Sequence, residues 1–367
     1  MERRRGFGRP TMASHSSLVD MALSDIARKT ERMINQVGRQ RKTAKGWKPA
    51  VTGFSGYGSS DRVHVLGRVL MEDPYSEPET EIQRGWRQFI TTQVGNHPVT
   101  VRVGDQVVQS KSDANGYIDV LVLDHGLEPG WNEVVIEAKD AEPATARVLI
   151  VEPGARIGLV SDIDDTVMVT WLPRAVLAAW NSWVRHTNTR KPVPGMAEFY
   201  RQLLADHPGA PVVYLSTGAW NTFETLQSFI DVNGLPDGPM LLTDWGPTPT
   251  GMFRSGQEHK KVQLRNLFID FPDINWILVG DDGQHDPLIY GDAVFEHPDR
   301  IAGVAIRQLS AGEHVLSHGT VSALEDIDAD DRHGAPVIQG ADGFELLREF
   351  RAKPFPQVTG TLEQGAE

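Results

Sequence analysis

The sequence predicts an α/β, Rossmann-like doubly wound parallel sheet preceded by a small antiparallel β-sandwich domain. The chain has 367 residues, which is more than one hydrophobic core usually serves. Short runs rich in Val and Ile begin near residue 50, and fully apolar runs alternating with helical stretches follow from about residue 153. We therefore divide the chain into a basic N-terminal arm with an amphipathic helix (1–50), a β-sandwich domain (51–152), an α/β domain (153–355) and a flexible tail (356–367).

The N-terminal arm differs in charge from the rest of the chain. It contains twelve Lys or Arg and four Asp or Glu, so it carries +8, whereas the whole chain carries −13 and the remainder therefore −21. Apolar residues recur at helical spacing behind Ser17, a candidate N-cap: Leu18, Met21, Ala22, Ile26, Met33 and Val37. The arm predicts peripheral contact with an anionic membrane. The alternatives are a solubilising tail, or a helix that packs on the protein's own body.

The β-sandwich prediction comes from five runs with apolar residues at alternate positions, separated by Gly, Pro, Asp and Asn. The runs cover 62–70, 98–108, 117–123, 132–138 and 146–152. This alternation and spacing are typical of antiparallel sandwiches. No residues suited to catalysis gather in this segment, which predicts a scaffold or a binding module.

The α/β domain is predicted from four apolar strands that alternate with helical segments. The strands are expected at 156–162, 210–217, 275–281 and 301–307, and the helices at 195–206, 220–232, 259–270 and 286–295. Such strands form parallel sheets covered on both faces, which bind ligands beyond the carboxyl ends of the strands. Polar residues follow three of the strands at that edge: Asp162; Ser216 and Thr217; Asp281 and Asp282.

Composition limits the chemistry. The chain has no cysteine, so a metal would be held by oxygen or imidazole. The net charge of −13 argues against nucleic acid as a partner. No apolar run is long enough to span a membrane, and no apolar segment follows the basic N-terminus, so we expect a cytoplasmic protein.

Three carboxylates occur within four residues in SDIDDTV (161–167), at the end of a predicted buried strand. Carboxylates this close raise each other's pKa unless a cation is present, so they indicate a metal site or a turn with Asp165 as a helix N-cap. An EF-hand loop is excluded because Val167 occupies the position that requires glycine.

Asp-x-Asp-x-Thr after an apolar strand resembles the first motif of the haloacid dehalogenase superfamily of phosphotransferases. The resemblance implies that Asp162 is the nucleophile and Asp164 the general acid and base. VVYLSTG resembles the second motif, which implies that Ser216 hydrogen-bonds a phosphoryl oxygen, with Thr217 and Gly218 beside it in the substrate site.

EHKKVQLRNLF resembles the third motif of the superfamily, a helix that begins with a lysine near the nucleophile. His259, Lys260 and Leu264 match the pattern of His-Lys followed by an apolar residue, which implies that Lys260 contributes to catalysis and substrate binding. Lys261 is the alternative.

WILVGDDGQHDPLIY resembles the fourth motif, which completes an oxygen-ligand Mg²⁺ site with the first. The resemblance implies four metal ligands, namely Asp162, Asp164, Asp281 and Asp282, with Asp282 binding directly or through water. We expect Asp286 to orient Lys260 or to cap the next helix, and His285 to face the substrate or the surface.

Together, SDIDDT, KPVPGMAEFYRQL, LSTGAWN, LPDGPMLLTDWG, HKKVQLRNLFIDFP and VGDDGQHDPLIY resemble the phosphatase domain of the actin patch-associated phosphatidate phosphatase family over about residues 155–310. The resemblance implies a haloacid dehalogenase-like phosphatase domain and Mg²⁺-dependent hydrolysis of phosphatidic acid to diacylglycerol and phosphate through an aspartyl-phosphate. One departure is visible: Asp282 stands where the family usually has serine. No segment of this sequence resembles the long interaction tails of the fungal members, so the resemblance is not extended to actin binding.

The substrate is expected to be a phosphate monoester, and a lipid is favoured. Trp171, Leu172, Val176, Leu177, Trp180 and Trp183 lie between the first two motifs and suit either an acyl chain or an ordinary helical cap. Two alternatives remain: a phosphatase of the same mechanism acting on a soluble phosphomonoester or phosphoprotein, and a non-catalytic lipid- or protein-binding module.

Overall fold

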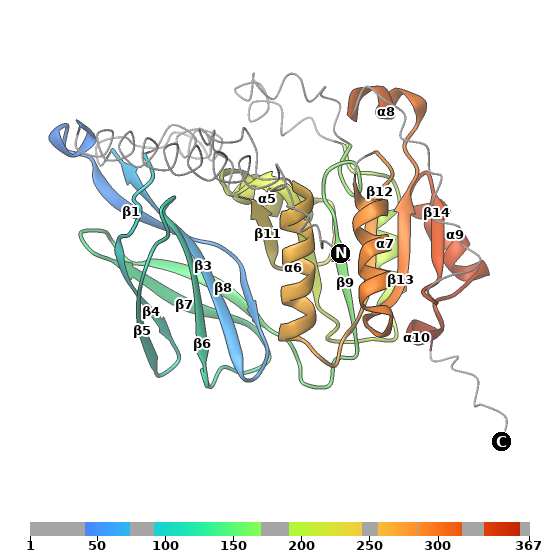
Figure 1. The fold of residues 1–367 in the computed structure, drawn as a ribbon, viewed down its shortest axis with the longest axis horizontal. Helices are drawn as coiled ribbons and strands as arrows, with labels where there is room; N and C mark the ends of the chain where they lie inside the picture. Colours follow the sequence, from blue (N-terminus) through green and yellow to red (C-terminus); the bar gives the residue numbers. More distant parts are fainter. Residues whose placement is uncertain are drawn as a thin grey trace, which may run out of the picture.

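The computed structural model describes residues 41–73, 92–169, 191–243, 256–283, 285–317 and 334–359. They form two sheets that lie side by side (Figure 1). The predicted amphipathic helix and the apolar residues 171–183 lie outside the described residues. Among the helices of the described part, none is both long and apolar enough to cross a membrane.

The N-terminal sheet has eight strands: β1 (Lys48–Gly53), β2 (Gly56–Gly58), β3 (Arg62–Glu72), β4 (Pro98–Val103), β5 (Gln106–Lys111), β6 (Tyr117–Leu123), β7 (Gly130–Ala138) and β8 (Ala144–Ile150). The strand pairs of this sheet within the described residues are antiparallel, except β2 with β8. Alternate residues of β6 are buried, so its pleat turns Ile118, Val120 and Val122 into a shared core with β3, β4, β7 and β8. The antiparallel β region predicted before the α/β domain is confirmed.

The second sheet is parallel throughout, in the order β11-β10-β9-β12-β13-β14. Its strands are β9 (Ile157–Ser161), β10 (Val212–Ala219), β11 (Met240–Thr243), β12 (Asn275–Asp281), β13 (Ile301–Arg307) and β14 (Val337–Gly340). From β9 the chain adds β10 and β11 on one side, and it then returns to add β12, β13 and β14 on the other side. Right-handed connections in these two directions place helices on opposite faces of the sheet. The predicted doubly wound α/β fold is confirmed.

The helices are α4 (Met196–Leu203), α5 (Phe223–Val232), α6 (Gly256–Asp270), α7 (Asp286–Glu296), α8 (Ala311–Ser317), α9 (Gly343–Ala352) and α10 (Pro356–Thr359), with short 3-10 turns at Trp220–Thr222 and Pro298–Arg300. In Figure 1, α6 and α7 lie next to each other in front of the sheet. Helices α4 and α9 contact each other elsewhere in the domain. Every residue of β9 and β13 is buried, which accounts for their continuous apolar runs.

All four predicted strands and all four predicted helices of this domain are present, although α6 begins three residues earlier than expected. Strands β11 and β14 were not predicted, because four residues are too few to show a period. The tail predicted from residue 356 begins too early. Residues 356–359 form α10, where Val358 is buried and its carbonyl oxygen contacts Nε2 of His207 at 2.6 Å.

The N-terminal sheet packs against the β11 side of the parallel sheet. Phe54 stacks on Trp220 with ring centroids 4.5 Å apart, and Met240 N donates a hydrogen bond to Ser55 Oγ at 3.1 Å. Tyr57 hydroxyl lies 3.4 Å from Asp270 at the end of α6. Since Phe54 and Tyr57 belong to the core cluster of the α/β domain, the two sheets share buried apolar surface.

Candidate active site

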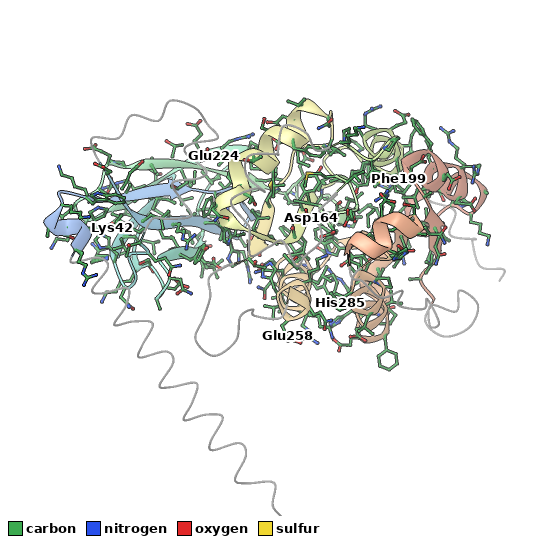
Figure 2. The ribbon with its side chains drawn as sticks, turned by 90° about the horizontal axis from the view of Figure 1, so that it is seen from above. Lys42, Asp164, Phe199, Glu224, Glu258 and His285 are labelled. Atoms are coloured by element: carbon green, nitrogen blue, oxygen red, sulfur yellow. The ribbon has the colours of Figure 1, made fainter. Side chains whose placement is uncertain are left out.

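The four sequence motifs meet at the carboxyl edge of the parallel sheet, because β9 lies between β10 and β12. Viewed from above, Asp164 lies between α5, marked by Glu224, and α6, marked by Glu258 (Figure 2). The strands therefore bring together side chains that are as much as 124 residues apart, from Asp162 to Asp286.

Lys260 forms the centre of a buried ion cluster. Its Nζ lies 2.7 Å from Asp162 Oδ1 and 2.5 Å from Asp286 Oδ1. All three side chains are 4% exposed or less. Lys261 instead pairs with Asp292 at 2.7 Å, in a contact open to solvent. The structure thus places Lys260, and not Lys261, beside the predicted nucleophile.

Asp164 faces the second motif. Ser216 Oγ donates to Asp164 Oδ2 at 3.2 Å and accepts a hydrogen bond from Gly218 N at 2.9 Å. Thr217 is turned toward the start of α6, since a Cβ on Gly256 would lie 2.6 Å from Thr217 Cγ2. Of the predicted substrate-binding residues, Ser216 and Gly218 therefore lie beside Asp164, and Thr217 packs against the helix.

A tight turn begins at Ile163, between the two aspartates of the first motif. The backbone N–H groups of Thr166, Val167 and Met168 point to the carbonyl oxygen of Ile163. Thr166 Oγ1 donates to Asp162 Oδ2 at 3.3 Å. Asp165 adopts a left-handed conformation with φ of 58°, within this turn rather than at the start of a helix.

Asp162, Asp281 and Asp286 form a cluster of three buried carboxylates whose candidate ligand atoms lie within 4.8 Å of one another. Asp281 Oδ1 accepts from Gly283 N at 2.8 Å. Asp281 Oδ2 and Asp286 Oδ2 are buried and accept no hydrogen bond from the residues that the structure describes. Buried carboxylate oxygens without donors fit a divalent cation, which takes oxygen ligands.

Of the four predicted ligands, the cluster contains Asp162 and Asp281, whereas the side chain of Asp164 contacts Ser216 and is not part of it. Asp282 lies outside it, because successive strand residues point to opposite faces. Its Oδ1 accepts from Leu309 N at 2.8 Å and lies 3.3 Å from His314 Nε2. Asp286 contacts Lys260 as expected and also belongs to the cluster, which the sequence reasoning missed. The available signal was its place at the first residue of α7, five positions after Asp281.

Burial sets the protonation of the cluster. It raises the pKa of Asp162 to about 7, with the charges of Asp286 and Asp164 adding to the effect and Lys260 opposing it. Burial likewise holds the pKa of Asp281 well above its usual value. Although burial alone lowers the pKa of Lys260, Asp162 and Asp286 raise it above the usual value, so the ammonium stays charged.

These pKa values predict how the metal-free protein responds to pH. Between the ordinary aspartate value of 3.8 and about 7, the folded protein holds more protons at Asp162 than the unfolded chain does, so this group makes stability fall as pH rises. We expect the melting temperature in EDTA to fall between about pH 5 and pH 8, and to fall less steeply in Asp162→Asn. The gain from a divalent cation should grow over the same range, because its ligands are then deprotonated. Identical pH slopes for the two proteins would contradict the assignment of the raised pKa.

Comparisons with known proteins agree with the site. Residues 157–308 match the family described as phosphatidate phosphatase APP1, catalytic domain. The chain is 30% identical over 152 residues to the phosphatidate phosphatase APP1 of Saccharomyces cerevisiae, covering 41% of this chain and 26% of that protein. It is 26% identical over 157 residues to an uncharacterized protein of Schizosaccharomyces pombe, covering 42% of this chain and 25% of that protein.

The chain spans about a quarter of the length of these curated relatives. Among solved structures, the HAD domain of the effector protein Lem4 from Legionella pneumophila matches with a TM-score of 0.28 and 16% identity, covering 42% of this chain and 85% of that chain. The motifs quoted from the sequence, the parallel sheet that brings them together and the family match all fall on the same segment. Residues 157–308 are therefore similar, in sequence and in the order of their motifs, to the family described as phosphatidate phosphatase APP1, catalytic domain.

Proposed function

We propose that this chain is a Mg²⁺-dependent phosphatase that hydrolyses phosphatidate to diacylglycerol and phosphate through an aspartyl-phosphate on Asp162. One observation carries the proposal. The carboxylate of Asp162 is held between the Lys260 ammonium, at 2.7 Å, and two further buried carboxylates. A buried nucleophile next to a cation and an oxygen-ligand site suits phosphoryl transfer, in which positioning and charge neutralisation dominate.

In the proposed reaction, an oxygen of Asp162 attacks phosphorus, and the bond from phosphorus to the ester oxygen breaks. Asp164 gives its proton to that oxygen, which leaves as the alcohol. The carboxylate of Asp164 then takes a proton from water, whose oxygen attacks phosphorus and frees Asp162 with release of phosphate. Ser216 donates to a phosphoryl oxygen, which is supported by its position 3.2 Å from Asp164.

Lys260 and a bound Mg²⁺ would act on different groups: Lys260 on the carboxylate of Asp162, and the ion on the phosphoryl group. Asp162, Asp281 and Asp286 would hold the ion, which neutralises phosphoryl charge when bound. Lys260 favours the ionised form of Asp162 against the effect of burial and orients it, since its Nζ contacts Asp162 and Asp286 at once. Asp286 in turn fixes Lys260, so the two ends of the cluster support each other.

The choice of phosphatidate rests on the family of residues 157–308. Peripheral contact of the basic arm with an anionic membrane is the accompanying proposal, because twelve Lys or Arg fall within the first fifty residues. An enzyme that works on a membrane surface should depend on the lipid surface as well as on the substrate's chemistry.

Phosphate release tests both the substrate and the chemistry. The full chain is assayed on phosphatidate in mixed micelles, with Mg²⁺ and with EDTA, beside a panel of soluble phosphomonoesters. We expect release from phosphatidate that requires Mg²⁺ and is lost in EDTA. Phosphate release from soluble esters alone would be consistent with the proposed mechanism but would contradict phosphatidate as the substrate. No release from any ester would favour a binding module instead of an enzyme.

A further inference from the structure

Arg307 is a buried arginine at the carboxyl end of β13 that the reaction above does not use. Its side chain is almost fully enclosed. Nη1 donates to the carbonyl oxygen of Asp165 at 2.7 Å, Nη2 to Glu313 Oε1 at 2.6 Å, and Nε to the carbonyl oxygen of Ala341 at 3.1 Å. One guanidinium therefore joins the first-motif turn to two other segments of the domain.

The contact with Asp165 falls where the turn needs support. Asp165 is buried and has φ of 58°, a conformation that costs a non-glycine residue free energy. The left-handed residue directs its carbonyl oxygen to Arg307, and a buried carbonyl oxygen without a donor is unfavourable. Asp164 directly precedes Asp165, and Thr166, which directly follows it, donates to Asp162 Oδ2 at 3.3 Å, so the conformation of Asp165 affects where both carboxylates point.

Glu313 on α8 fixes the guanidinium from the other side. Its Oε1 accepts from Arg307, and its Oε2 accepts from Ser310 N at 2.8 Å. The next residue, His314, lies 3.3 Å from Asp282. Asp282 directly follows β12, and Arg307 ends the neighbouring strand β13, so two adjacent residues of α8 contact the ends of both strands. Asp282, which stands where the family usually has serine, therefore helps to hold α8 through its contact with His314.

We propose that Arg307 is a positioning residue that holds the turn carrying Asp162 and Asp164, and that Glu313 on α8 holds Arg307 in the required orientation. The inference rests on the proposed function, since it concerns the geometry of the same reaction. Arginine suits the task because its planar group carries five donors in fixed directions. A lysine has one nitrogen and cannot reach Asp165, Glu313 and Ala341 together.

The test compares Arg307→Gln, Arg307→Lys and Glu313→Gln with a matched control, Arg265→Gln. Arg265 also pairs with a glutamate, Glu296, at 2.7 Å, but on the surface away from the site. With a soluble phosphomonoester and with phosphatidate, we expect Arg307→Gln to lower kcat about 100-fold, the order that a misplaced catalytic group costs, with little change in KM. Glu313→Gln should lower kcat less, and the double variant should lose less than the product of the single losses. Arg265→Gln should keep the wild-type kcat.

Hydrogen exchange separates positioning from general structural loss. The amides of residues 166–168 should exchange faster in Arg307→Gln than in wild type, whereas amides of β12 should not change. If Arg307→Gln does not fold, Glu313→Gln carries the same comparison, because it leaves the guanidinium in place. Wild-type kcat and wild-type exchange at the turn in a folded variant would overturn the inference. A wild-type protein that hydrolyses no ester would overturn the proposed function, while the exchange comparison still decides the role of Arg307.

Discussion

Asp162→Asn is expected to reduce turnover at least about 1000-fold, equivalent to about 4 kcal/mol of transition-state stabilisation. The amide has nearly the shape of the carboxylate, but its oxygen does not form the covalent intermediate. Phosphate release at saturating substrate and Mg²⁺ measures the effect. Turnover above a few per cent of wild type would remove Asp162 from the role of nucleophile.

The same variant should fold as well as the wild type in EDTA. Burial disfavours the charged form of Asp162, so the neutral amide removes an unfavourable charge. Lys260 keeps its contact with Asp286 at 2.5 Å. We therefore expect a melting temperature in EDTA at about pH 8 that is equal to or above that of the wild type. A smaller gain from Mg²⁺ should accompany it, because one ligand is weakened.

Lys260→Met is expected to lower kcat about 100- to 1000-fold, the loss typical of removing one group that stabilises transition-state charge. It should also destabilise the metal-free protein by about 3–5 kcal/mol at neutral pH, because it leaves buried carboxylates without their cation. Lys261→Met is the matched control. Lys261 lies next in sequence but pairs with Asp292 at the surface, so its removal should change stability by less than about 1 kcal/mol.

The pH dependence identifies the cause of the instability. The pKa values of Asp162 and Asp281 are raised by burial, so mild acid protonates both groups and removes the repulsion that Lys260→Met leaves behind. The stability gap between Lys260→Met and wild type, measured by urea unfolding in EDTA, should narrow from about pH 8 to pH 5. A gap that is independent of pH would mean that lost packing, rather than lost charge, destabilises the variant.

Much of the α/β domain was predictable because its strands are buried on both faces. A strand such as β12 shows an unbroken apolar run that ends at Asp281, and the carboxyl ends of parallel strands meet at one edge. Lys260 also had a local signal, since it shares the buried stripe of α6 with Leu264 and Leu267. Lys261 is rotated about 100° from that stripe, which accounts for its surface position.

Other parts of the site lacked such a signal. The choice between Asp282 and Asp286 as cluster members depends on which way each side chain points beyond the end of β12, and residue type alone does not give that direction. The contact of Arg307 with Asp165 joins residues 142 positions apart through a backbone carbonyl, which no side-chain pattern encodes. Contacts of this kind depend on how the strands are placed in the sheet, which the local sequence pattern does not specify.

The packing of Ser55 and Phe54 against the β11 side covers one edge of the parallel sheet. Strand β11 ends the parallel sheet, and Met240 N is directed away from β10 toward Ser55. Open strand edges of this kind recruit strands from other molecules. A fragment starting at residue 153 would expose the edge of β11 and the ring of Trp220. It should therefore self-associate at concentrations where the full chain does not. Self-association of the fragment alone would mean that the N-terminal sheet protects the full chain from aggregation by covering this edge.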